Sequence, residues 1–308
     1  MDLSTDVALV DLAPVDKVKA YVALTKPRII ELLLITTVPT MFVAKQGVPS
    51  LGLVLLTLLG GTLAAGGANA INMVIDRDID RLMERTKKRP LVTGAMTPKA
   101  ALVFALSLEV LAFVQLWLTV NLLSAVLAVS ATAFYVFIYT MWLKRRSKQN
   151  IVIGGAAGAV PVLVGWAAVT NSLAWAPVLM FLVIFIWTPP HFWALAVRYR
   201  DDYAAADVPM LPVVASMERT AVEILVYTVV LVATTALLGA VAHLGAIYAV
   251  TALVLGLIFI AGAVKLVQLA KANKAAEKEA MRLFSYSISY LSLLFIAMAI
   301  DVLVFSPK

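Results

Sequence analysis

Amide and carboxylate side chains recur at four-residue intervals in the stretch NAINMVIDRDIDRLMERTKKRP, residues 69–90. A long apolar run, LGLVLLTLLGGTLAAGGA, leads into it. If that run is a helix that continues, Asn72, Asp76 and Asp80 lie on one narrow stripe, because residues four apart share a helix face. A separate basic stripe then carries the arginines of this stretch, Arg77, Arg81 and Arg85.

A solvated helix end with surface salt bridges is the plainest interpretation of this stretch, but it fits poorly. Asp76 and Asp80 are like charges four residues apart on a helix, which is destabilising, and no basic residue lies three or four positions from Asp76. A divalent cation would relieve that repulsion. Oxygen ligands suit Mg2+, which is often held by one or two carboxylates together with substrate phosphates. The RTKKRP run that follows would hold the same phosphates by charge-assisted hydrogen bonds. We therefore predict a metal–diphosphate site.

A second charged stretch, RYRDDYAAADVPMLP, covers residues 198–212. Taken alone, it is equally well explained as a solvated loop. If it faces the first stretch across a bundle, Asp202 supplies the second half of a two-sided magnesium site, with Asp201 or Asp207 as substitutes. The prolines of PMLP stiffen the loop, because each fixes its own φ and restricts the preceding residue.

An ionisable side chain, His191, lies within an otherwise apolar run in WTPPHFW, residues 187–193. Two prolines there break the backbone hydrogen-bond ladder, which is tolerated where the freed groups line a cavity or find other partners. An ionisable residue inside a membrane span is a functional hypothesis by default. We expect His191 to contact a substrate or transfer a proton; a kink histidine bonded to a carbonyl is the alternative.

Composition indicates a polytopic α-helical membrane protein. The 308 residues are 62% hydrophobic and 14% charged, with a mean hydropathy of +0.96, and soluble domains carry about 25% charged residues. The alternating segments of a transmembrane barrel are lacking from the sequence. Absence of cysteine excludes disulfides and thiolate sites, and two histidines are too few for a histidine-rich metal cage. The net charge of +7 is explained by lysines and arginines in the loops on one side of the membrane, so nucleic acid is not an expected partner.

Apolar runs long enough to cross about 30 Å of hydrocarbon predict nine transmembrane helices in a bundle around a central cavity. They fall at residues 28–46, 51–75, 98–119, 122–142, 151–170, 174–197, 220–240, 243–267 and 283–304. Of the 25 lysines and arginines, 23 then lie on one side. The positive-inside rule places that side, the amino terminus and the cavity opening in the cytoplasm, and the carboxyl terminus outside. We expect a multi-pass protein of a bacterial plasma (inner) membrane, with residues 1–308 forming one domain and residues 1–25 a cytoplasmic segment.

The spacing of Asn72, Asp76 and Asp80, followed by RTKKRP, resembles the first signature of the UbiA-type intramembrane prenyltransferases, which have nine transmembrane helices. Further stretches resemble one branch of that superfamily, the protohaem IX farnesyltransferases or haem O synthases. They are TKPRIIELLLITTVPTM, YTMWLKRRSKQNIVIGGAAGAVPVLVGW, WTPPHFWALAVRYRDDY and AADVPMLPVV. The second UbiA motif is usually D-x-x-x-D, whereas Ala206 follows Asp202 here, and Asp202-Tyr203 with PMLP is the form of the haem O branch. The resemblance covers residues 20 to about 215; the last third matches only in hydropathy.

This resemblance implies transfer of the farnesyl group of farnesyl diphosphate to a vinyl group of haem B, giving haem O for terminal oxidases. It implies Mg2+ as cofactor, membrane lipid as surroundings, and a haem A synthase or an oxidase assembly factor as partner. Catalytic and metal-binding roles are implied for Asn72, Asp76, Asp80 and Asp202. Candidate diphosphate ligands, some of which could serve topology alone, are Arg28, Arg85, Arg89, Lys144 and Arg145. His191 is the candidate haem contact, and Glu109, deep in a predicted span, has no assigned role.

Two alternatives remain at the level of the sequence. A UbiA-type enzyme could prenylate an aromatic quinone precursor instead, although the PPHFWALA and PMLP stretches argue against it. A secondary transporter with an acidic ion site is the alternative from another class. Transporters usually place such sites near the membrane midplane, whereas Asp76 and Asp80 are expected at the cytoplasmic end of a span.

Overall fold

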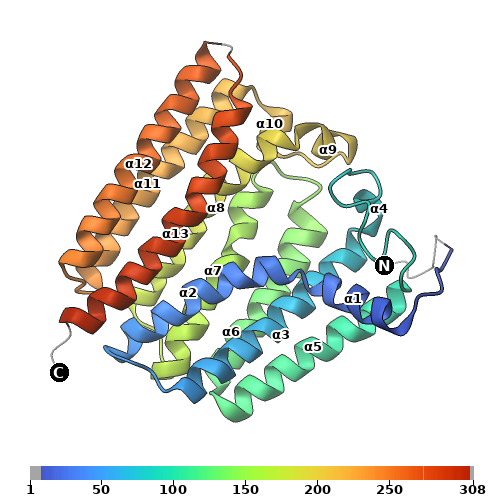
Figure 1. The fold of residues 1–308 in the computed structure, drawn as a ribbon, viewed down its shortest axis with the longest axis horizontal. Coiled ribbons are helices and arrows are strands. Elements are labelled where there is room, and N and C mark those ends of the chain that lie inside the picture. Colours follow the sequence, from blue (N-terminus) through green and yellow to red (C-terminus); the bar gives the residue numbers. More distant parts are fainter. Residues whose placement is uncertain (1–7, 273, 306–308) are drawn as a thin grey trace.

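The structure, a computed structural model, describes residues 8–272 and 274–305, the side chains of residues 28–34 excepted. Within these residues the chain folds into helices and contains no strand (Figure 1). In chain order the helices are α1 (Pro14–Thr25), α2 (Pro27–Lys45), α3 (Leu51–Ile75), α4 (Arg77–Asp80), α5 (Pro98–Thr119), α6 (Leu122–Ala133), the π-helix η1 (Phe134–Leu143), α7 (Asn150–Thr170), α8 (Trp175–Arg198), α9 (Arg200–Ala205), α10 (Leu211–Val214), α11 (Met217–Val241), α12 (Ala246–Lys271) and α13 (Glu277–Phe305).

The prediction of an all-α polytopic membrane protein is confirmed. Among the described residues, 8 helices are long and apolar enough to cross a membrane, with α6 and η1 together forming the span Leu122–Leu143. The predicted bounds 51–75 and 98–119 coincide with those of α3 and α5. The first predicted span corresponds to α2, which has 19 residues, several with undescribed side chains. A total of nine spans therefore stays a prediction.

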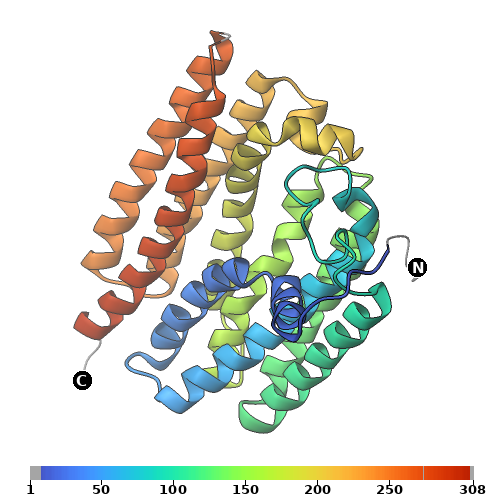
Figure 2. The same cartoon turned by 45° about the vertical axis from the view of Figure 1, so that its right-hand side comes forward.

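The long helices close into a ring because α2 packs against both α7 and α13 and so joins the beginning of the chain to its end. In Figures 1 and 2, α11, α12 and α13 stand together on one side of the bundle, and α1, α3 and α5 stand on the other. Large apolar side chains such as Leu118, Trp175 and Leu257 are exposed on the outside. Exposed apolar surface of this extent is typical of a lipid-facing protein.

Helix α8 continues through its two prolines. Pro189 and Pro190 are buried inside a helix that extends from Trp175 to Arg198, so the expected break does not end the element. Their neighbours Thr188 and His191 line the internal cavity. The prolines are thus accommodated where the helix meets a cavity, in agreement with the expectation for such positions.

The first charged stretch lies where α3 gives way to α4. Asp76 caps α3, and its carbonyl accepts from the Asp80 backbone N–H at 2.9 Å, so the helical path continues to Asp80. It ends there, and residues 81–97 form turns and irregular structure. The predicted placement of Arg85 on a helical stripe with Arg77 was therefore wrong, because Arg85 belongs to a loop.

The π-helix η1 changes which residues of its segment share a face. The Lys144 N–H donates to the Tyr139 carbonyl, five residues back, at 2.8 Å. On an α-helix the nine residues from Tyr135 to Lys144 would place them on opposite faces, at about 100° per residue. In a π-helix, residues four and five apart stack instead. Tyr135, Tyr139 and Lys144 consequently all line the internal cavity.

Candidate active site

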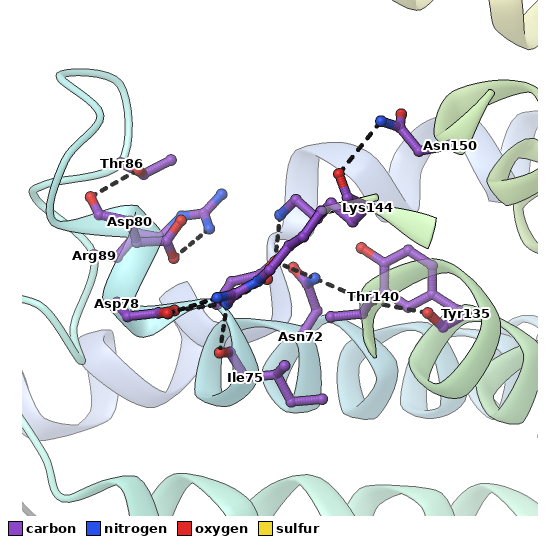
Figure 3. Close-up of polar contacts among 12 residues, drawn as sticks. Asn72, Ile75, Asp78, Asp80, Thr86, Arg89, Tyr135, Thr140, Lys144 and Asn150 are labelled. Carbon is purple, nitrogen blue, oxygen red and sulfur yellow. Dashed lines mark hydrogen bonds and ion pairs between the residues drawn. The ribbon is translucent and has the colours of Figure 1, made fainter. Parts of the chain in front are cut away.

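A cavity of about 640 Å³ lies inside the ring of helices, with walls from α2, α3, α6, η1, α7, α8 and α13. Its lysines, arginines and acidic residues gather at one end, between α4, the end of α3 and η1 (Figure 3). We call this cluster the charged end; Lys26, Asn72, Asp80, Arg89 and Lys144 line the cavity there, and Asp76 is buried behind Asn72 and Lys144, to which it is hydrogen-bonded. A second group on α8 and α13, here called the aromatic wall, consists of Trp187, His191 and Phe284, which line the cavity, and Ser287, which is buried in contact with His191.

Asp76 is the most enclosed member of the charged end, with 0% of its surface exposed. Its Oδ2 accepts from the Lys144 ammonium and, at 2.7 Å, from the Asn72 amide. Its Oδ1 is buried and has no hydrogen-bond partner in the described part of the chain; Arg145 Nη2 lies 3.7 Å away. A buried carboxylate oxygen without a hydrogen-bond partner can accept a further cation or donor.

Asp80 is paired with a cation from its own loop. It is 2% exposed, and its Oδ2 accepts from Arg89 Nη1 at 2.6 Å. The Thr86 hydroxyl donates to the Asp80 carbonyl at 2.9 Å and draws the following turn back over the helix end. The repulsion expected between Asp76 and Asp80 is therefore offset in the structure by Lys144 and Arg89, which reach them from later in the chain.

Asn72 joins three segments at the charged end. Its amide nitrogen donates to Asp76 and, at 3.2 Å, to the Thr140 hydroxyl on η1, while its amide oxygen accepts from Lys26 Nζ at 2.9 Å. Burial, with Arg89 and Lys144 nearby, lowers the pKa of Lys26 to about 7. Crowded cations of this kind would be stabilised by a polyanion bound among them.

A carboxylate of the second acidic stretch meets the loop that follows the first stretch. Asp202 on α9 accepts from the Arg85 backbone N–H at 3.1 Å, and the Arg85 guanidinium lies 5.7 Å from the Tyr199 ring centroid. Arg85 also lines the cavity, whereas Asp202 does not. The other two aspartates of this loop, Asp201 and Asp207, are exposed and do not line the cavity.

One of the predicted diphosphate ligands is not brought to the cavity, and a second has a side chain that the structure does not describe. Arg145 makes two hydrogen bonds to Asp78, at 2.6 and 2.7 Å, and does not line the cavity. Arg28 lies in α2, but its side chain is outside the described residues. The remaining three predicted ligands, Arg85, Arg89 and Lys144, all line the cavity.

At the aromatic wall, the His191 imidazole is 7% exposed and lines the cavity. Trp187 stacks on it with ring centroids 4.1 Å apart, and Phe284 packs against it at 4.6 Å. Its Nδ1 lies 2.6 Å from the Ser287 hydroxyl of α13. The structure therefore places His191 on a different wall from the aspartates.

Several residues that line the cavity or contact its lining were not found from the sequence. Lys26 lies two residues before Arg28 in the TKPR motif, and its charge was a signal that could have singled it out. The positions of Thr140 and Tyr139 depend on the π-helix, and no sequence pattern predicted that helix. Ser287 lies in SYSISY, where hydroxyl groups in an apolar span were an available signal. Glu109, left without a role, accepts at 3.1 Å from the hydroxyl of Thr132, a cavity-lining residue.

Comparison with known proteins agrees with this geometry. The model of the UbiA prenyltransferase family matches residues 33–288. A Streptomyces avermitilis protein named protoheme IX farnesyltransferase is 57% identical over 286 residues, covering 92% of this chain and 94% of its own. Its namesake from Streptomyces coelicolor is 55% identical, covering 92% and 91%.

Solved structures share the fold. A digeranylgeranylglyceryl phosphate synthase superimposes with a TM-score of 0.75 at 18% identity, covering 94% of this chain and 100% of its own. A UbiA homologue from Archaeoglobus fulgidus, bound to DMAPP and Mg2+, gives a TM-score of 0.65 at 20% identity, covering 92% and 99%. With the family model matching most of its length, the chain belongs to the UbiA prenyltransferase family.

Proposed function

We propose that this protein transfers the farnesyl group of farnesyl diphosphate to a vinyl group of protohaem IX, giving haem O and diphosphate. Relatives at 50–57% identity carry the name protoheme IX farnesyltransferase. The observation that carries the proposal is one cavity with Asp80 and several cations at one end, Asp76 buried directly behind them, and an aromatic wall with a histidine elsewhere. The charged end suits a diphosphate, and the aromatic wall suits a flat macrocycle.

Magnesium is the expected cofactor, and the residues present fit it. Asp76 offers a buried oxygen without a hydrogen-bond partner, and Asp80 and Asn72 add further hard oxygen donors. Among the described residues, no three His, Asp or Glu side chains form a ready metal site. The fit is thus to Mg2+ shared between one or two carboxylates and the substrate phosphates. When bound, the metal supplies charge neutralisation of the diphosphate leaving group.

The chain's own residues bind and orient the diphosphate. Lys144 and Arg89 neutralise buried carboxylates, and a metal ion that took over this pairing would leave both cations able to turn toward phosphate oxygens. Lys26 adds a third cation, held in place by Asn72. We propose Arg85 as a further phosphate ligand from the loop, with Asp202 fixing the backbone of that loop.

The reaction is a substitution followed by hydration. The bond between farnesyl C1 and the diphosphate oxygen breaks, and the vinyl carbon bonds to C1. Water then adds to the cation left on the neighbouring carbon, and its proton leaves, giving a hydroxyl group. Tyr135 and Tyr139 lie in the cavity with ring centroids 5.4 Å apart, and aromatic faces stabilise a nearby cation. We propose that they flank the allylic carbon.

The assay uses purified full-length protein with protohaem IX, farnesyl diphosphate and MgCl2, and analyses haems by chromatography and mass spectrometry. The expected product is heavier than protohaem by one farnesyl group plus one hydroxyl. EDTA should abolish its formation. An intact preparation that farnesylates an aromatic quinone precursor but not protohaem would contradict the proposal.

We also propose that the charged end faces the bacterial cytoplasm, with the carboxyl terminus outside. Its loops carry most of the basic residues, as the positive-inside rule requires. Because the chain has no cysteine, single substitutions give clean accessibility probes. In right-side-out vesicles, Ser172→Cys in the α7–α8 turn should react with an impermeant maleimide and Lys88→Cys should not. The reverse pattern would invert the topology.

A further inference from the structure

The hydrogen bonds of Ser287 decide which nitrogen of His191 carries a proton. The Ser287 hydroxyl lies 2.6 Å from His191 Nδ1 and donates to the Phe284 carbonyl, also at 2.6 Å. A hydroxyl has one proton. Both contacts are satisfied together only if His191 Nδ1–H donates to the Ser287 oxygen while the Ser287 proton goes to the carbonyl. In the neutral imidazole, Nε2 is then without a proton and carries its lone pair.

The same neighbours hold the imidazole in one orientation. The Trp187 indole N–H donates to the Ser287 carbonyl at 2.8 Å, which ties α8 to α13 at the level of the histidine. Trp187 and Phe284 pack against the ring, and Phe192 meets it edge-on at 5.1 Å. In the described part of the chain no carboxylate contacts His191 and no hydrogen bond reaches its Nε2. Burial among aromatic rings without an anion favours the neutral form.

Neutral imidazole with a bare Nε2 is the form that binds metals, and its tautomer is set by the hydrogen bond at the other nitrogen. A propionate, by contrast, needs an N–H donor and would be repelled by the lone pair. We infer that His191 Nε2 is an axial ligand of the haem iron and that Ser287 is the positioning residue that fixes its tautomer. This inference rests on the proposed function, in which haem is the substrate.

Ligation through the iron has a consequence for the reaction. A macrocycle held at its centre by His191 keeps its vinyl edge free of protein ligands. That edge can then be directed toward the charged end, where the allylic carbon is released.

The test uses absorption and electron paramagnetic resonance of ferric protohaem IX bound to the purified full-length protein. His191→Ala should lose the nitrogen-ligated spectrum and bind haem about 10- to 100-fold more weakly, and added imidazole should restore the spectrum. Ser287→Ala should weaken binding on the order of 10-fold, and Ser287→Thr should retain it. His243→Ala is the matched control, because His243 is exposed in the α11–α12 turn and should change nothing.

Iron-free protoporphyrin IX separates ligation from packing. If His191→Ala weakens protoporphyrin and haem binding equally, or leaves the haem spectrum unchanged, ligation is overturned. A Ser287→Ala spectrum and affinity equal to wild type would overturn the positioning role. The wild-type farnesylation assay tests the function separately: ligation without any farnesylated product refutes the function alone, and product formed without ligation refutes this inference alone.

Discussion

The charged end and the aromatic wall are both buried, yet they satisfy their polar groups in different ways. At the charged end, Asp76 and Asp80 form ion pairs with the long side chains of a lysine and an arginine. At the aromatic wall, His191 is held by a short hydroxyl contact and flanking rings. Ion pairs can exchange partners when a polyanion arrives, whereas a fixed imidazole can only accept a ligand at one place. The first region is suited to a group that leaves, and the second to a substrate held still.

The largest expected effect comes from removing a charge at the charged end. Asp76→Asn keeps the shape of the side chain but removes its anion, so it should lower kcat/KM by about 10³-fold. The measurement is initial rate against farnesyl diphosphate concentration, with thermal unfolding followed in parallel. Asp78→Asn is the control, since this neighbour is 60% exposed and pairs with Arg145 outside the cavity. Loss of less than tenfold in Asp76→Asn would refute its role.

Removing the paired cation should have a smaller effect than removing the carboxylate. Lys144→Met should raise the KM for farnesyl diphosphate by about 10- to 100-fold, because a hydrogen bond from a charged group contributes roughly 1.5–3 kcal/mol. Lys148→Met, in the same basic run but exposed, is the control and should stay near wild type. Equal KM values in the two variants would place Lys144 in a structural role only.

The contrast between these regions also shows what the sequence could predict. Hydropathy predicted the bounds of α3 and α5, because the length and apolar character of a span are local properties of the chain. Four-residue spacing found Asp76 and Asp80 for the same reason. Their cationic partners could not be matched to them, since Lys144 lies 68 residues from Asp76. This pairing depends on how η1 packs beside α3, and no local sequence pattern predicts that packing.

Where local rules did fail, the cause is a change of helix type or a helix end. The sequence 134–143 is apolar and reads as a continuing α-helix, but it adopts π geometry and turns Tyr139 and Lys144 inward. Similarly, the helical stripe stops at Asp80, so Arg85 reaches the cavity from a loop. Both departures are at the cavity, where local strain is expected to serve function.

A third variant tests whether the inward turn of η1 matters. A methyl group added at Gly154 would lie 2.3 Å from the Tyr139 ring, so Gly154→Ala must displace that ring. We expect turnover to fall about 10-fold, with overpacking costing roughly 1–3 kcal/mol in stability. Gly158→Ala, one turn along α7 and also lining the cavity, meets nothing within 4 Å and is the matched control. Equal turnover in both would show that the position of Tyr139 is not critical.

The smallest effect should come from loosening the aromatic wall without removing any ring. Trp187→Phe keeps a ring beside His191 but loses the N–H that donates to the Ser287 carbonyl. Trp193 lies on the same helix, is 1% exposed, and its buried N–H has no partner among the described residues. Trp193→Phe therefore removes a similar volume and no hydrogen bond.

The difference between the two variants should be about 1 kcal/mol in the free energy of unfolding, or roughly 2 °C in Tm. Haem affinity should fall a few-fold in Trp187→Phe alone, because only that change frees the turn that carries Ser287. If both variants lose affinity equally, the wall acts through its packed volume, and the hydrogen bond between α8 and α13 does not fix the histidine.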